Sequence, residues 1–410
     1  MKKVMCLTAL FILILVFTPG CEGPAGSAGP QGPQGDPGDP GDPANPSAVY
    51  LSTPRFNSAT ASAVISWTIN VDGNFQEYRL YRSDSPGVTD SSTLVTTITN
   101  RYSAFYEDEF GTKPTNYYYY KVYSYNLSGA STPSNEVILT GLYLLKFSFG
   151  SFGTGDGEFK FPGDVAVDED GNIFVADSDN FRIQKFDSDG NYLAQWGSQG
   201  TGNGQFGTPT YIEYAPDGNL YVGDWGNNRV QIFDTSGTYI GQFATVGGPG
   251  DSFIAENGDI YVPDNTNNLV RWFDPTFVLR LTWGGVGTGP GQFTNLWIIK
   301  ASPDGGRLYI MDQANDRVQV FTNNGVYLSQ FVGAGTAPGQ CVNCLGLGVD
   351  NFGLVYVADR HDGMIQIYDE YGGFIEEFVV APGIWGVCFD IDNNLYVVDS
   401  WNNMVHVFGP

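Results

Sequence analysis

Six aspartates recur at a nearly regular interval along the C-terminal two thirds of the chain. They are separated by 47, 40, 48, 47 and 40 residues and are Asp177, Asp224, Asp264, Asp312, Asp359 and Asp399. Asn or Asp follows each at the third position, and Arg182, Arg229 and Arg317 follow three of them at the fifth. The pattern suggests either a ring of ligands or a repeated turn. Because short polar side chains bond readily to nearby backbone in turns, we predict a structural role, with the arginines as charge partners.

Bulky residues beside these aspartates differ from one repeat to the next. Four stand one or two residues beyond the repeating Asp and three open the first apolar run of a repeat; the set is Trp225, Arg360, His361, Trp401, Tyr211, Trp297 and Trp385. Aromatic rings with one Arg and one His suit stacking on a sugar or holding a peptide. Scattered surface aromatics are also ordinary, so the sequence leaves both interpretations open.

Further carboxylates, Asp164, Glu213 and Asp251, fall in the first apolar run of their repeats, as does Lys300. Three converging carboxylates could hold a divalent cation such as calcium, whereas ordered water around them is the other interpretation. The DEDG, DSDG and DIDN stretches lack the terminal Glu of a calcium loop and suit hairpin turns. We therefore predict no cofactor, with a channel-bound divalent cation as the alternative.

Signals for other catalytic chemistry are weak. The chain has two histidines, too few for a His-rich zinc site. It has no Gly-x-Ser-x-Gly nucleophile elbow and no phosphate-binding loop. The sequence assigns no catalytic residue.

Three cysteines lie in the repeat region. In an oxidising compartment a disulfide is expected, either between Cys341 and Cys344 or between one of these and Cys388. The spacing alone leaves both pairings open.

The repeating segment predicts the fold that positions these residues. Residues 163–196 read as four short alternating strands separated by Asp-Gly, Asn and Gly turns. Six units of four strands with a period near 45 residues are typical of β-propeller blades. The last unit stops after its third strand, and residues 144–149 look like a missing fourth strand. We predict that this N-terminal strand completes the sixth blade and closes the ring.

The six copies, such as VADSDNFRIQKFDSDG and VGDWGNNRVQIFDTSG, resemble NHL repeats. The resemblance implies a six-bladed β-propeller over residues 144–410 that serves as a non-enzymatic platform for a protein, peptide or glycan. Propellers similar in fold include lyases and lactonases that hold a metal in the channel. They provide the alternative, a lyase or hydrolase that uses a divalent cation.

Residues 48–140 alternate as strands with an aromatic core of their own. Trp67, the YRLYRS run and YYYYKVYSYNLSGASTPSNEV resemble a fibronectin type III domain. The predicted class of the whole chain is therefore all-β, a six-bladed propeller preceded by a β-sandwich.

Residues 1–20 combine Lys2 and Lys3 with an apolar run too short to span a membrane, which suits an export signal. The Gly-Cys end resembles a bacterial lipoprotein signal, which implies lipidation of Cys21; ordinary cleavage and secretion is the alternative. Residues 21–46 carry Gly at every third place from Gly23 to Gly41, as in collagen. We expect a spacer in a monomer, with a trimeric stalk as the alternative.

The net charge of the chain limits the classes of partner that it can bind. Lys and Arg total 19 against 44 Asp and Glu, a formal net charge of -25. Such a chain repels phosphate backbones and anionic lipid surfaces, so nucleic acid is excluded as a partner. We expect an exported protein anchored to the membrane only by lipid, which binds a protein, peptide or glycan at the cell envelope or surface.

Overall fold

The computed structural model describes residues 46–51, 55–57, 62–110, 118–139 and 143–409. The predicted export signal, Cys21 and residues 21–45 of the collagen-like segment lie outside these ranges. No helix in the described part of the chain is long and apolar enough to cross a membrane. Strands and turns dominate, which confirms the predicted all-β class.

Two antiparallel sheets form the first folded region. One sheet joins β1 (Arg55–Asn57), β2 (Ser62–Ser66) and β5 (Phe105–Glu109). The other orders β4 (Thr93–Ile98), β3 (Phe75–Ser83), β6 (Tyr118–Asn126) and β7 (Ser131–Pro133), and β8 (Val137–Leu139) also pairs with β6. Buried Trp67, Tyr78, Leu80, Tyr120 and Val122 belong to one core cluster, as the alternating pattern predicts.

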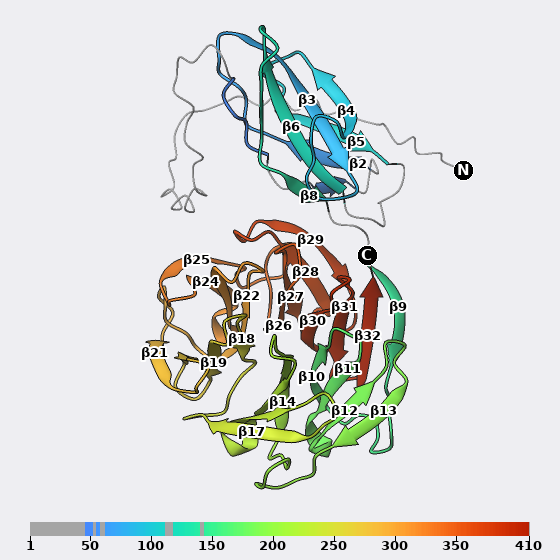
Figure 1. The fold of residues 1–410 in the computed structure, drawn as a ribbon, viewed down its shortest axis with the longest axis vertical. Coiled ribbons are helices and arrows are strands. Elements are labelled where there is room, and N and C mark those ends of the chain that lie inside the picture. The colour runs from blue at the N-terminus through green and yellow to red at the C-terminus, as the bar shows by residue number, and fades with distance from the viewer. Residues whose placement is uncertain (1–45, 52–54, 58–61, 111–117, 140–142, 410) are drawn as a thin grey trace, which may run out of the picture. The chain divides into compact units, whose positions relative to one another are not determined.

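Six four-stranded antiparallel sheets follow along the chain (Figure 1). The first has β10 (Pro162–Val167), β11 (Ile173–Asp177), β12 (Arg182–Phe186) and β13 (Tyr192–Trp196). The second has β14 (Pro209–Tyr214), β15 (Leu220–Asp224), β16 (Arg229–Phe233) and β17 (Tyr239–Ala244). The third has β18 (Phe253–Ile254), β19 (Ile260–Asp264), β20 (Leu269–Phe273) and β21 (Leu279–Gly284).

The remaining three sheets repeat this order. They are β22 (Leu296–Ala301), β23 (Arg307–Asp312), β24 (Arg317–Thr322) and β25 (Tyr327–Phe331); β26 (Cys344–Val349), β27 (Val355–Asp359), β28 (Met364–Tyr368) and β29 (Phe374–Val379); and β30 (Ile384–Phe389), β31 (Leu395–Asp399), β32 (Met404–Gly409) and β9 (Leu144–Phe149). Short 3₁₀ turns follow three second strands: η1 (Ser178–Asn180), η2 (Trp225–Asn227) and η3 (Gln313–Asn315).

The sheets pack against one another in sequence, and their first strands line the centre. β10 contacts both β14 and β30, and β26 contacts both β22 and β30. Apolar clusters fill the junctions; one joins Phe174 and Ile183 of the first sheet to Ile212 and Val222 of the second. The arrangement in Figure 1 is propeller-like.

Strand β9 closes the last sheet. It pairs with β32, and Phe149 lies opposite Val405. The prediction that residues 144–149 supply the missing fourth strand is therefore confirmed. This pairing joins the beginning of the repeat region to its end, which leaves no gap in the last sheet.

The loops between sheets hold a repeated buried aromatic. Phe159, Phe206 and Phe293 are fully buried, and each forms a short parallel bridge within its loop. Cys341 takes the same place in the fifth loop and forms a disulfide with Cys344. Of the pairings left open by the sequence, the structure has this one, and Cys388 keeps a free thiol.

We expect Phe149→Ala to weaken the closure. Phe149 lies against Phe186 with ring centroids 4.8 Å apart and belongs to the core between the last and first sheets. Removal of a buried Phe side chain should lower the free energy of unfolding by about 3 kcal/mol, measured by denaturant titration. The control is Phe152→Ala, because Phe152 is 70% exposed and its loss should change stability by less than about 0.5 kcal/mol. Equal stabilities of the two variants would contradict the closing role of β9.

Candidate functional site

Each repeating Asp is buried and saturated with hydrogen bonds. Asp224 accepts bonds from the backbone N–H of Gly207 at 2.7 Å and from the side chains of Asn227, Arg229 and Gln231 at 2.8, 2.9 and 3.4 Å. Asp177 and Asp312 have the same kinds of partner in their repeats. Carboxylates with all these donors have little capacity left for a ligand, so their role is structural.

The arginines of this network hold the loop that enters the sheet. Arg229 Nη2 donates to the carbonyl oxygens of Gly202 and Gln205 at 2.8 and 2.7 Å. The third sheet has Leu269 at the expected Arg position, and Arg271, two residues further along the same strand face, bonds to Asp264 instead. The sequence analysis missed the bond between Arg271 and Asp264 because it considered only the fifth position after each Asp.

Asp359 differs, since among the described residues it has no side-chain cation as a partner. It accepts bonds from the backbone N–H groups of Val342, His361 and Asp362. The residue next to it, Arg360, is therefore not part of the repeated Asp–Arg network.

We call one end of the sheets the loop face. It carries the repeating aspartates and the loops between sheets. Five of the seven bulky residues that the sequence singled out form one connected cluster, named here the mouth cluster: Tyr211, Trp297, Arg360, Trp385 and Trp401. The Trp297 and Trp385 rings are 6.4 Å apart and nearly perpendicular, and Tyr211 lies 6.1 Å from Trp297. The Arg360 guanidinium carbon lies 4.9 Å from the Trp385 ring centre and 5.3 Å from that of Trp401.

Exposure within the mouth cluster is uneven. Tyr211 is buried, Trp297 and Trp385 are partly buried, and Trp401 is 55% exposed. The cluster thus combines a buried base with an exposed indole.

Two predicted members of the site lie apart from the mouth cluster. Trp225 is 45% exposed and packs over the backbone of Gly248, where an added Cβ would lie 2.2 Å from the indole nitrogen. His361 is exposed and pairs with neighbouring Asp362 at 2.8 Å. Conversely, Phe161 joins the cluster 5.6 Å from Trp385 and was missed by the sequence analysis. It holds a loop position that varies between repeats, so the criterion used for the tryptophans would have identified it.

Arg360 has an unusual electrostatic environment. Six of the seven arginines between residues 143 and 409 pair with Asp or Glu: Arg182, Arg229, Arg271, Arg280, Arg307 and Arg317. Arg360 has no carboxylate partner among the described residues, and its Nε atom is buried without a hydrogen bond. Burial lowers the pKa of its guanidinium below the usual value.

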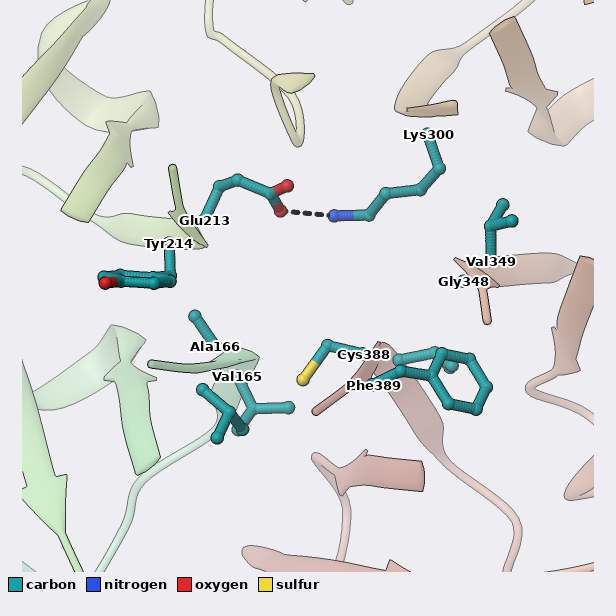
Figure 2. A pocket seen from close by; sticks show the side chains of 11 residues that line it. Val165, Ala166, Glu213, Tyr214, Lys300, Gly348, Val349, Cys388 and Phe389 are labelled. Atoms are coloured by element: carbon teal, nitrogen blue, oxygen red, sulfur yellow. Dashed lines mark hydrogen bonds and ion pairs between the residues drawn. The ribbon is translucent and has the colours of Figure 1, made fainter. Parts of the chain in front are cut away.

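A second candidate site is a cavity of about 130 Å³ between the first strands of the sheets. Lys300 and Glu213 meet across it in Figure 2, with Nζ and Oε2 2.7 Å apart, and Cys388 lines the same cavity. The Lys300 ammonium also lies 2.9 Å from Asp251 Oδ2. Asp164 accepts a bond from the backbone N–H of Ile212 at 3.2 Å.

Glu213 and Asp251 therefore have a protein cation as their partner. No group of three or more His, Cys, Asp or Glu side chains within the described ranges is placed to hold a metal ion. The sequence-based alternative placed a divalent cation among Asp164, Glu213 and Asp251. In the structure the Lys300 ammonium lies within ion-pair distance of the last two. The sequence placed Lys300 near these carboxylates without recognising that its ammonium would neutralise them.

The protonation of the carboxyl groups in the channel depends on their burial and on the excess of carboxylates over ammonium groups. Burial raises the pKa of Asp251 to about 7 although Lys300 opposes the shift. Burial, with the charge of Asp251, also raises the pKa of Asp164 well above its usual value. The pKa of the Cys388 thiol is raised by burial too, so this thiol is not an activated nucleophile.

We expect the stability of the protein to fall as the pH rises from about 4 to about 7. The unfolded Asp loses its proton near a pKa of about 3.9, whereas folded Asp251 keeps its proton up to about 7. Over this window the folded state binds more protons, so increasing pH favours unfolding. Denaturant midpoints measured across this range should decline more steeply for the wild type than for Asp251→Asn. Parallel curves would contradict a proton held at Asp251.

Comparisons with known proteins identify the repeats. The NHL repeat model matches residues 159–186 and 206–233. Protein lin-41 of Caenorhabditis elegans is 46% identical over 48 residues, 12% of this chain and 4% of that protein. Protein brain tumor of Drosophila melanogaster is 38% identical over 69 residues, 17% of this chain and 7% of that protein. The chain thus spans only a small part of the length of these curated relatives.

Solved structures resemble the chain in fold. A structural genomics protein of unknown function from Bacteroides thetaiotaomicron superposes with a TM-score of 0.52 at 18% identity, over 90% of this chain and 99% of that one. A streptogramin B lyase structure gives a TM-score of 0.49 at 12% identity, over 65% of this chain and 97% of that one. This protein carries NHL repeats in a propeller-like all-β fold.

Proposed function

We propose that the loop face is a non-enzymatic binding platform for a protein, peptide or glycan. In this proposal residues 144–410 are one six-bladed NHL propeller and residues 48–140 are a fibronectin type III-type sandwich. Export through residues 1–20, lipidation at Cys21 and a collagen-like spacer over residues 21–46 would present the platform at the cell envelope. A trimer formed through the spacer remains the alternative to a monomer.

The mouth cluster is the observation that carries this proposal. Aromatic side chains from three first strands and from the turn after β31 converge at one end of the sheets, with an Arg that lacks a carboxylate partner among the described residues. Exposed aromatic residues supply large contact areas at low entropic cost, and Trp, Tyr and Arg dominate the energetics of many interfaces. Trp401 and Trp225 offer exposed indoles for such contacts.

The channel gives little support to the enzyme alternative. Glu213 and Asp251 pair with Lys300, and burial raises the pKa of the partly buried Cys388 thiol. A lyase or hydrolase that held a divalent cation between these carboxylates would have to displace the paired Lys300 ammonium. The binding platform is therefore the better supported function.

Trp401→Ala should weaken binding to envelope material. Because the indole is 55% exposed, its loss should leave the fold intact and lower affinity about tenfold or more, as for an interface hot spot. The full chain is immobilised, and separated protein and glycan fractions of the envelope are applied. The matched control is Ile391→Ala, a 74% exposed residue in a turn between β30 and β31. Equal binding by the wild type and both variants would contradict the proposal.

A further inference from the structure

Arg360 is an unmatched positive charge in a strongly acidic protein. Carboxylates outnumber basic residues 44 to 19, and every other Arg from residue 143 to 409 has one within ion-pair distance. A folding chain with such an excess of acids could readily supply a partner. The lack of one among the described residues indicates that the guanidinium is available to an external anion.

The surroundings of Arg360 raise the cost of leaving it without an anion. The rings of Trp385, Trp401 and Phe161 lie 4.9, 5.3 and 6.0 Å from its guanidinium carbon. Ring faces attract the charge but do not replace strong acceptors for the five N–H donors of a guanidinium. Nε is buried without a partner, and burial lowers the pKa of the group. A carboxylate that reached this guanidinium would satisfy donors and stabilise the charged form.

The residues beside Arg360 favour a sugar over a peptide. Trp401 presents an exposed indole, and sugar rings stack on such surfaces. Amide side chains lie near Trp297: Gln313 accepts a bond from its indole nitrogen at 2.9 Å and donates to Asn343 at 2.6 Å. One of the two Nε2 hydrogens of Gln313 makes this bond to Asn343, and the other can donate to a sugar hydroxyl.

A peptide strand would find few free backbone donors at this turn. The backbone N–H groups of His361 and Asp362, just after Arg360, already bond to Asp359 at 3.0 Å. The addition of a peptide strand depends on unpaired main-chain groups. This part of the loop face is therefore suited to contact through side chains.

The net charge limits the ligand further. A formal charge of -25 repels polyanions at long range, whereas one carboxylate can bind to a single, partly buried guanidinium. We propose that the mouth cluster binds a saccharide with one isolated or terminal uronate, an inference that rests on the binding function proposed above. Arg360 pairs with the uronate carboxylate and Trp401 stacks on the sugar ring.

The test uses the full chain and two matched probes, a disaccharide ending in glucuronate and its methyl ester. The ester keeps the shape of the sugar and removes only the charge. We expect calorimetry to show that the acid binds at least about tenfold more tightly than the ester, as for a charge-assisted bond. Arg360→Gln should abolish this difference, and Arg360→Lys should retain part of it because Lys lacks the planar fork.

Arg280→Gln is the matched control. It removes the same charge from an Arg that is exposed and paired with Asp274, so it should preserve the preference for the acid. Thermal melts of all variants establish that each is folded. Equal affinities for acid and ester in the wild type would overturn the proposal, as would a preference for the acid that survives Arg360→Gln.

Two further outcomes separate this inference from the proposed function. A peptide with a free C-terminal carboxylate that displaces the disaccharide and binds more tightly would overturn the assignment to a glycan. If neither sugar binds but Trp401→Ala still weakens binding to envelope fractions, the uronate assignment fails and the binding platform stands. If Trp401→Ala also has no effect, both fail.

Discussion

The structure depends on one buried carboxylate that closes the second strand of each repeat. In the second sheet, Asp224 bonds at once to the backbone of the preceding loop, to Asn227 in its own turn and to Arg229 on the next strand. One side chain thus fixes a turn, a strand pair and a loop between sheets. An ionised group without these partners would be costly to bury, so the donors around it must be retained together.

This dependence separates structural residues from residues that are free to vary. Arg182, Arg229 and Arg317 hold the loops, and Arg271 and His406 reach the same carboxylate position from two residues further along the strand. The fifth sheet meets its Asp with backbone donors instead. Arg360 therefore has no part in supporting a loop and can contribute to a surface that differs from one repeat to the next.

The sequence predicted the elements well because their signals are local and repeated. Strand alternation, turn residues and the Asp spacing determine the four strands of each sheet, and the missing last strand pointed to residues 144–149. The disulfide and the Arg271 substitution were harder to predict. Cys341 occupies the place of a buried Phe in other loops. The recurring Gly-Gln-Phe and Gly-Gln-Cys motifs show this equivalence in the sequence, but they do not identify the cysteine with which Cys341 pairs.

The sequence predicted which residues belong to the site but not how they are arranged. Variation between repeats selected Tyr211, Trp297, Trp385, Trp401 and Arg360, yet the distances that join them depend on how four sheets converge. The same convergence places Lys300 between Glu213 and Asp251, a pairing between the second, third and fourth repeats that no local pattern encodes.

The charged groups around Lys300 and the mouth cluster differ in their capacity to bind a ligand. In the interior, Lys300 pairs with Glu213 and Asp251, and burial raises the pKa of Asp251 to about 7 and that of Asp164 well above its usual value. Because these groups already interact with one another, they would gain little free energy from binding a ligand. At the loop face, by contrast, Arg360 carries a partly buried charge whose Nε has no hydrogen-bond partner. Electrostatic free energy is available where an anion can reach the molecule from outside, so recognition is expected at the rim of the channel and not within it.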